Sequence, residues 1–186
     1  MMSSTSAEPT ATTAMDAAAV IDAARRVLTD VQLGFLTTSG TTGPSVRMVG
    51  HLSVDERLRV VFGTARSTRK VAELRADPAV VYAVGDDRSA ACLYGTATLD
   101  EDVDHRRAAW GPDLARYFSG PEDAEFVLVV IDPDRVEVWS EPERIYTGPN
   151  GLTVAVATRS GDKWAGPSST YPPGKRTQIP LAVAPE

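Results

Sequence analysis

The stretch "LRVVFGTARSTRKVAELRADPAVVYAV", residues 58–84, joins two β-branched runs through a segment rich in cations and hydroxyls. The two outer runs are typical of strands, because β-branched and aromatic side chains pack well on a pleated sheet. Between them, Val71 and Leu74 are three residues apart and Pro78 ends the pattern, which predicts a short helix with Lys70 in its first turn. The cationic group therefore lies at a junction between a strand and a helix.

Such a junction is a favourable place for an anion. The first turn of a helix has unpaired N–H groups and a partial positive charge. Ser67, Thr68, Arg69 and Lys70 add hydroxyl and cationic donors at this point, which predicts a phosphate cradle. Taken alone, the segment also fits a second interpretation, in which the cations form a solvated face of the helix.

The rest of the chain outside its ends is dominated by short β-branched runs separated by Gly, Pro and Asp. They are "LGFLTTS", "PSVRMVGHLSV", "LRVVFGT", "AVVYAVGD", "SAACLYGTATLD" and "FVLVVIDPDRVEVWS". The two helical intervals among them are "TRKVAELRADP" and "DVDHRRAAWGPDLARYF". This spacing predicts a mainly β fold with a few helices, an antiparallel barrel of about six or seven strands, rather than parallel βαβ units.

The two ends of the chain have a different character from its middle. Residues 1–14 are small and polar, which predicts a disordered tail. From Asp16, a helix cap, apolar residues recur at three- and four-residue spacing, which predicts a helix of about four turns. We expect one domain over residues 15–147, followed by a C-terminal strand in 152–160 and a proline-rich arm within 148–186, either extended across a partner or disordered.

Composition excludes several functional classes. A chain of 186 residues with 42% hydrophobic content can bury one core. Its net charge of -6 argues against a nucleic-acid or membrane-surface binder, which needs a basic face. One cysteine, no signal-peptide pattern and no long apolar run predict a cytoplasmic protein. The two histidines, His51 and His105, have no metal-ligand spacing, so we expect no metal site.

Four short motifs occur in an order that resembles the pyridoxamine 5'-phosphate oxidase-like family of flavin-binding split barrels. The motifs are Arg47-Met48-Val49, Gly63-Thr64, Thr68-Arg69-Lys70 and Asp77-Pro78. The resemblance covers roughly residues 33–146, and the stretch "RRAAWGPDLARYFSGPEDAEFVLVVIDPDRVEVWS" is similar to the general stress protein branch of that family. It implies an FMN-binding split β-barrel.

The same resemblance implies a phosphate site. It assigns Arg47 and Lys70 to the FMN phosphate, with Thr68 and Arg69 beside them. The chemistry agrees, because a dianionic phosphate needs charge-assisted donors and a guanidinium supplies two in one plane. In an extended strand Arg47 also lies on the face opposite to Val46 and Met48.

The remaining implied contacts concern the flavin ring and its side chain. Met48 and Val49 would present backbone groups to the ring, and Gly63 and Thr64 would border the ribityl chain. For Val49 and Gly63, ordinary strand packing is an equally good interpretation. Trp139 would cover the flavin between the subunits of a homodimer, or alternatively pack as a buried aromatic residue.

Departures from the family pattern limit the activity. True oxidases of vitamin B6 continue from the E-x-W strand into an R-L-H-x-R motif that grips the substrate, whereas this chain reads "ERIYTGPN". Tyr146 stands in place of the histidine, Pro149 or its neighbours stand in place of the last arginine, and Ala90 replaces a polar amide. We therefore expect no oxidation of vitamin B6 phosphates.

Two functional classes remain open. The first is an oxidoreductase that uses FMN, or alternatively a deazaflavin, on a small organic substrate, with a reduced nicotinamide as a candidate electron donor. The second is a flavin-binding stress or sensor protein with little turnover. His51 and Tyr146 are candidate proton donors for the first class if either reaches the pocket.

Overall fold

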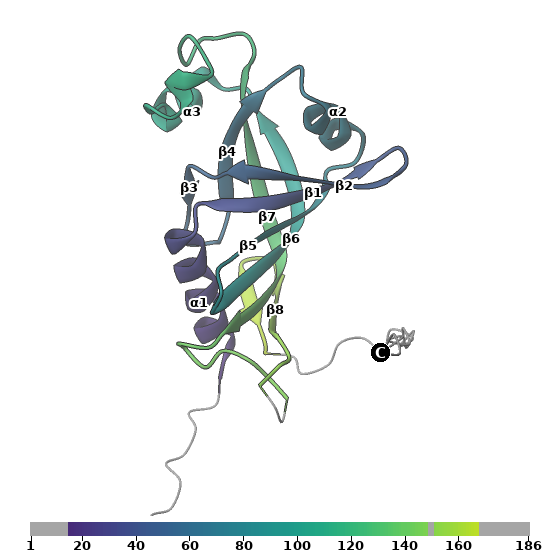
Figure 1. Ribbon diagram of the computed structural model, residues 1–186, viewed down its shortest axis with the longest axis vertical. Helices are drawn as coiled ribbons and strands as arrows, with labels where there is room; N and C mark the ends of the chain where they lie inside the picture. Colours follow the sequence, from purple (N-terminus) through teal and green to yellow (C-terminus); the bar gives the residue numbers. More distant parts are fainter. Residues whose placement is uncertain (1–14, 149–150, 168–186) are drawn as a thin grey trace, which may run out of the picture.

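The computed structural model describes residues 15–148 and 151–167, and its strands form one antiparallel sheet (Figure 1). The strands are β1 (Leu33–Gly40), β2 (Gly43–Gly50), β3 (Ser53–Val54), β4 (Val60–Ala65), β5 (Ala79–Gly85), β6 (Ser89–Asp100), β7 (Phe126–Ser140), β8 (Ala155–Ser160) and β9 (Lys163–Ala165). Seven of them follow the order β2-β1-β5-β6-β7-β4-β3, while β8 pairs with β7 and β9. The prediction of a mainly β, antiparallel fold is confirmed.

Residues 15–147 contain seven strands, β1 to β7, which agrees with the predicted six or seven, and the described part of the C-terminal segment adds β8 and β9. The run at 44–54 divides into β2 and β3, because the chain changes its hydrogen-bonding partner there: the His51 amide donates to Gln32, and the Leu52 amide donates to Val61. β8 lies within the strand predicted at 152–160, and β9 follows a tight turn at Gly161, where φ is +60°. The tail at 1–14 and the arm beyond 167 lie outside the described residues.

β7 remains a single strand of 15 residues although it contains a proline. Pro133 lies opposite Gly95, where the register between β6 and β7 shifts. A Cβ atom on Gly95 would lie 2.2 Å from the carbonyl oxygen of Asp132, so only glycine fits at this bulge. The bulge accommodates the missing N–H of the proline without ending the strand.

Three α-helices and one 3₁₀ helix accompany the sheet: α1 (Ala17–Asp30), α2 (Arg69–Ala76), α3 (Val103–Ala109) and η1 (Leu114–Arg116). The predicted cap of α1 is confirmed, since the Asp16 carboxylate accepts a hydrogen bond of 2.9 Å from the Ala19 amide. In α2 the predicted apolar pair, Val71 and Leu74, is buried. The second helical interval forms α3 and η1, with Pro112 between them.

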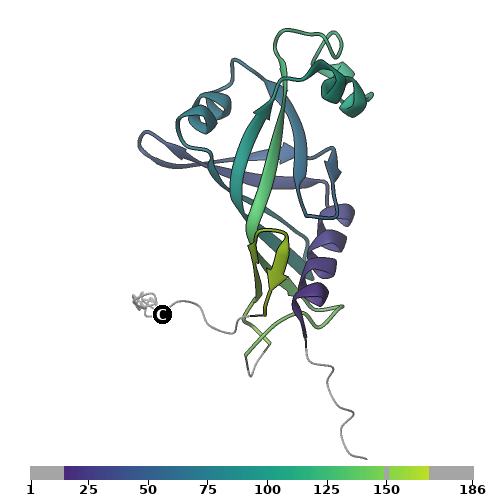
Figure 2. The same ribbon diagram turned by 180° about the vertical axis from the view of Figure 1, so that it is seen from behind.

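α1 packs against the sheet and closes the main core. Its buried face carries Val20, Ala24 and Leu28, which belong to the same buried cluster as Phe62 and Leu93 of the sheet. α2 and α3 lie at one end of the molecule, and the β8–β9 hairpin lies at the other end (Figures 1 and 2). No helix in the described part of the chain is long and apolar enough to cross a membrane.

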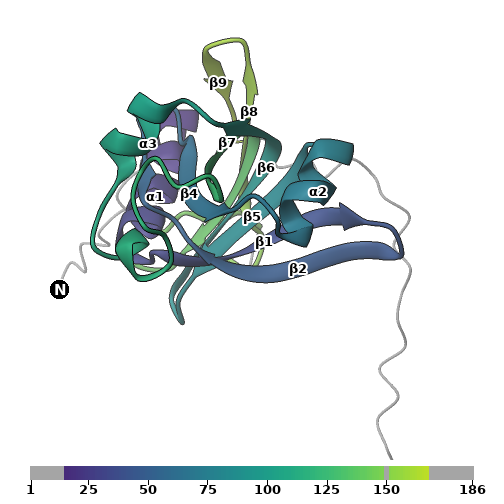
Figure 3. The same ribbon diagram turned by 90° about the horizontal axis from the view of Figure 1, so that it is seen from above.

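β2 is an edge strand whose outer face is apolar. Figure 3 shows it at the lower side of the view, with α1 and α3 toward the left and α2 next to the inner side of the strand. Leu33, Phe35, Val46 and Met48 are 56–62% exposed, and Phe35 lies directly opposite Met48 in the register of β1 and β2. The sheet therefore presents an apolar surface of β1 and β2 that no other described element covers, and we call these four residues the outer apolar face.

Candidate functional site

A cavity of about 710 Å³ lies where the end of β2, the end of β4, the first turn of α2 and η1 meet. Its size is that of a pocket for a cofactor-sized ligand. Five of the nine residues predicted from the sequence line it: Met48, Val49, Gly63, Thr64 and Lys70. The sequence stretch at 58–84 therefore contributes both a wall and a cation to one pocket.

Lys70 supplies the positive charge inside this cavity. Its Nζ donates a hydrogen bond of 2.8 Å to Thr64 Oγ1, and no carboxylate of the described residues forms an ion pair with it. Burial, and secondly the nearby charge of Arg47, lower the pKa of the ammonium. Because Arg47 has the same charge and no acidic side chain in the described part of the chain pairs with Lys70, binding of an anion near this ammonium would be electrostatically favourable.

Arg47 lies beside the cavity rather than in its lining. Its Nη1 donates to Thr38 Oγ1 and its Nη2 donates to Glu73 Oε2, and each hydrogen bond is 2.5 Å long. The predicted face is correct, because Arg47 is 17% exposed while its strand neighbour Met48 points outward. The structure thus brings the two predicted phosphate cations close together, but it also gives Arg47 an acidic partner that the sequence analysis did not identify.

Two further residues of the predicted cradle, Thr68 and Arg69, lie in different environments. Thr68 precedes the first residue of α2, but its hydroxyl donates to the Ala65 carbonyl, 2.8 Å away, and makes no capping bond. The first N–H groups of α2 therefore have no side-chain cap. Arg69 is 78% exposed and its Nε lies 3.3 Å from Glu73 Oε1. The solvated-face interpretation fits Arg69, whereas it does not fit Lys70.

Gly63 lines the cavity and also has a packing role, in line with the packing interpretation that the sequence left open for it. A Cβ atom at this position would lie 2.7 Å from Leu114 Cδ2 and 2.9 Å from Phe126 Cε2. The missing side chain lets η1 pack directly onto β4, so that Arg116 and Tyr117 form one wall of the cavity. The sequence predicted a helical interval here but not its place in the cavity wall, because a single turn of 3₁₀ helix has no apolar period that would show which face it packs.

His51 reaches the cavity lining, but both of its ring nitrogens are engaged. Nε2 lies 2.8 Å from the Leu28 carbonyl oxygen, so Nε2 carries the proton. Nδ1 accepts a hydrogen bond of 2.9 Å from the Tyr82 hydroxyl. Burial lowers the pKa of His51. This geometry argues against His51 as a proton donor. Tyr146, the other candidate, lies beside Gly151 and outside this cavity.

Trp139 is the one predicted residue that lies far from the cavity within a single chain. Its Nε1 donates to the Gly151 carbonyl over 2.8 Å, and it lies opposite Ala90. Phe126, at the other end of β7, lies opposite Ala65 beside the cavity. Twelve residues of extended strand lie between the two aromatic residues, a path of about 40 Å. A contact between Trp139 and a ligand in this cavity requires a second copy of the chain.

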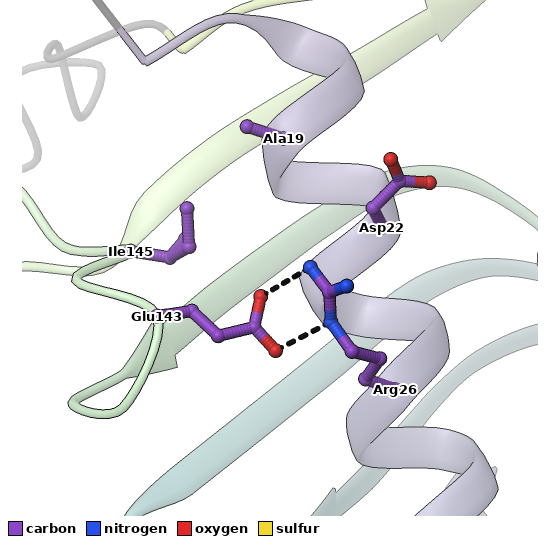
Figure 4. Close-up of a pocket in the computed structure, with 5 residues that line it drawn as sticks. All are labelled: Ala19, Asp22, Arg26, Glu143 and Ile145. Atoms are coloured by element: carbon purple, nitrogen blue, oxygen red, sulfur yellow. Dashed lines mark hydrogen bonds and ion pairs between the residues drawn. The ribbon is translucent and has the colours of Figure 1, made fainter. Parts of the chain in front are cut away.

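A second hollow, of about 570 Å³, lies between α1 and the segment after β7 (Figure 4). There Arg26 and Glu143 form two hydrogen bonds of 2.6 Å each, so both charges satisfy each other. None of the predicted site residues lines it. Among the described residues no group of three or more His, Cys, Asp or Glu side chains is arranged to hold a metal ion.

The fold and the cavity define a split β-barrel of the kind formed by FMN-binding proteins. The chain belongs to the family described as "Pyridoxamine 5'-phosphate oxidase like", whose family model matches residues 20–163. No curated protein sequence matches the chain.

Solved structures with the same fold come from several bacteria. The general stress protein 26 of Bacillus anthracis is 22% identical with a TM-score of 0.59, and the match covers 64% of this chain and 92% of that one. A pyridoxamine 5'-phosphate oxidase-related, FMN-binding protein of Nostoc punctiforme is 17% identical with a TM-score of 0.57, over 80% and 91% of the two chains. A heme-binding protein of Mycobacterium smegmatis is 20% identical with a TM-score of 0.54, over 64% and 53%. At these identities the likeness establishes the fold.

Proposed function

We propose that the protein binds FMN in the cavity beside α2 and acts as an FMN-dependent oxidoreductase on a small organic substrate. One observation carries the proposal: an ammonium without an acidic partner, Lys70, lies in the cavity at the uncapped first turn of a helix. Such a place favours a phosphate group. The FMN-binding relative from Nostoc punctiforme has the same fold, which supports a flavin as the ligand.

The residues present fit a flavin phosphate and its ring. Lys70 and the neighbouring Arg47 would hold the phosphate, and Met48 and Val49 of the β2 edge would face the ring. A bound flavin supplies the redox chemistry itself. The chain supplies binding and orientation, since His51, the histidine in the lining, has both ring nitrogens occupied.

The engaged state of His51 favours a second candidate function, a flavin-binding stress or sensor protein with little turnover. Such a protein needs no acid or base beside the flavin. A deazaflavin in place of FMN remains a candidate for the cofactor under either function. It would bring its own phosphate to Lys70.

The active form in this proposal is a homodimer. Leu33 and Met48 belong both to the cavity lining and to the outer apolar face, so the cavity opens onto a surface that is unfavourable in water. A second copy packed on this face would bury the apolar side chains and close the cavity. Trp139 of the second copy is then the candidate cover for the flavin.

Vitamin B6 phosphates are not the substrate in this proposal. Ile145, which follows Arg144 in the departing motif, is buried and pairs with Ser140, and Tyr146 occupies the position of the family's histidine. Pro149, the position of the expected last arginine, lies outside the described residues. The substrate-gripping pair of the true oxidases has no counterpart in the sequence "ERIYTGPN".

Titration of the purified protein with FMN, riboflavin and a 5-deazaflavin phosphate tests the proposal, with flavin fluorescence as the readout. We expect saturable FMN binding, with riboflavin weaker because it lacks the phosphate. Anaerobic addition of reduced nicotinamide, followed by absorbance of the bound flavin, distinguishes the oxidoreductase from the sensor: bleaching supports the former. No binding of any of the three ligands would refute the proposal, and formation of pyridoxal phosphate from pyridoxine phosphate would refute the exclusion of vitamin B6.

A further inference from the structure

Glu73 is an acidic residue at the centre of the cationic cluster. It lies on α2, three residues after Lys70 and four after Arg69, so the three side chains share one side of the helix. Its carboxylate accepts hydrogen bonds from Thr38 Oγ1 at 2.6 Å, from Ser45 Oγ at 3.0 Å and from Arg47 Nη2 at 2.5 Å. By charge alone, a carboxylate beside a phosphate site would repel the phosphate. The presence of Glu73 at this position therefore needs a physical explanation.

The surroundings keep Glu73 ionised. The hydrogen bond from Thr38 lowers the pKa of the carboxyl most, and the bonds from Ser45 and Arg47 lower it further against the effect of burial. The side chain is 10% exposed, so its partners rather than water satisfy it. The negative charge is thus a fixed part of the folded protein.

The three contacts immobilise the guanidinium of Arg47. Thr38 Oγ1 accepts from Arg47 Nη1 and donates to Glu73 Oε2, which also accepts from Arg47 Nη2. A closed ring of hydrogen bonds thus joins the three side chains. A guanidinium has five N–H donors, and these contacts use two of them. The remaining donors belong to a planar group whose orientation is fixed before any ligand arrives.

We propose that Glu73 is a positioning residue for phosphate recognition: it fixes Arg47 beside Lys70 so that both cations meet the flavin phosphate without a loss of side-chain freedom. This inference rests on the proposed function. Its physical basis is that ordering a long, flexible side chain upon binding weakens affinity, and a preordered side chain avoids that loss. The opposite effect, in which Glu73 competes with the phosphate for Arg47, predicts the reverse result in the same experiment.

Glu73→Gln is the informative substitution, because it removes the charge and keeps the size of the side chain. We expect FMN to bind about 2- to 10-fold more weakly, as for the release of one or two ordered side chains, and riboflavin to bind as before. Glu143→Gln is the matched control, since it removes a similar ion pair, that with Arg26, away from the cavity. It should leave both affinities unchanged.

A double-mutant cycle separates positioning from a general structural role. In an Arg47→Ala background, Glu73→Gln should cause no further loss of FMN affinity, because Glu73 then has no guanidinium to orient. Thr38→Val is a second variant that removes two of the three hydrogen bonds of the ring, keeps the direct contact between Glu73 and Arg47, and keeps the β-branched shape. It should weaken FMN binding in the same direction if the Gln variant does not fold.

The outcomes are distinct. Tighter FMN binding by Glu73→Gln, unchanged binding, or an equal loss for FMN and riboflavin would each overturn the inference while the proposed function stands. A wild-type protein that binds neither ligand would overturn the proposed function, and the inference with it. Selective loss for FMN that vanishes in the Arg47→Ala background is the result that supports positioning.

Discussion

Replacing Lys70 by alanine is the most direct perturbation of the proposed site. The ammonium lies in the cavity, its one hydrogen bond goes to the Thr64 hydroxyl, and no ion pair of the described residues depends on it. The helix should tolerate the change, since alanine favours helices and Val71 and Leu74 still anchor α2 to the core. A change in ligand binding can therefore be separated from a loss of fold.

The expected magnitude follows from the contact that is lost. A hydrogen bond to a charged group contributes roughly 1.5–3 kcal/mol, which corresponds to an FMN dissociation constant about 10- to 100-fold higher in Lys70→Ala. Riboflavin has no phosphate, so its affinity should change little. Because Lys70 is only half-buried, screening by salt should reduce the difference at high ionic strength.

The pH dependence provides a second, independent readout. Burial and the charge of Arg47 lower the pKa of Lys70 in the ligand-free protein. The protonated form binds phosphate, so FMN affinity should fall as pH rises through this lowered pKa, below the value of about 10.4 for an ordinary lysine. In Lys70→Ala this alkaline loss of affinity should disappear.

Flavin fluorescence titrations of wild type, Lys70→Ala and Lys163→Ala at matched ionic strength measure these effects. Lys163 is the control, because it is exposed on β9 at the other end of the molecule. Equal losses for FMN and riboflavin in Lys70→Ala would indicate a damaged fold or a ring contact. Unchanged FMN affinity would refute the phosphate assignment and return Lys70 to a solvated surface.

Three further predictions concern the face, the wall and the core histidine. Phe35→Asp should give a monomer by light scattering and lose FMN affinity, whereas Leu152→Asp, at an even more exposed apolar site elsewhere, should do neither. Gly63→Ala should displace η1 and weaken binding of both FMN and riboflavin, whereas Gly111→Ala has open space and should bind normally; equal affinities would contradict this packing role. The lowered pKa of His51 favours its neutral form in the folded state. The contribution of His51 to thermal stability should therefore be fully present above about pH 6.5 and decline below it, and His51→Gln should flatten that decline.

The elements with strong local patterns were predictable from the sequence. The apolar period of α1, its Asp16 cap and the short α2 all follow from side-chain spacing, and the structure confirms them. The division of the run at 44–54 into β2 and β3 was not predictable, because a change of pairing partner inside a run, as at His51, leaves no trace in the apolar pattern. Pro133 likewise marks a bulge rather than an end, since Gly95 lies opposite.

In the candidate site, features that depend on nearby residues were predictable, and those that depend on strand pairing were not. Lys70 in the first turn of α2 was predictable, because its position depends on nearby residues. The partner of Arg47 was not, because it depends on sheet register: Thr38 lies opposite Ser45, and both hydroxyls reach Glu73 from neighbouring strands. One signal was available, namely that Glu73 follows Lys70 by three residues and so lies on the same helix side.

Sheet register also indicates why one chain carries only part of the proposed site. Phe35 lies opposite Ala83, Ala83 opposite Cys92, and Cys92 opposite Glu137. Directly paired residues point to the same side of a sheet, and so do residues two apart in one strand. Trp139 therefore points to the same side of the sheet as the outer apolar face.

In a two-fold dimer, a residue of one copy contacts a different residue of the second copy, and the symmetry-related contact forms with the two copies exchanged. If the outer apolar face of one copy packs against the same side of the sheet of the second copy, the Trp139 end of β7 in each chain can approach the cavity of the other chain. Two equivalent contacts then form. Trp139→Ala should then weaken flavin binding while the dimer persists. Phe35→Asp should weaken it by separating the copies. Flavin affinity that is unchanged in Trp139→Ala but lost in Phe35→Asp would leave the dimer in place and remove Trp139 from the site.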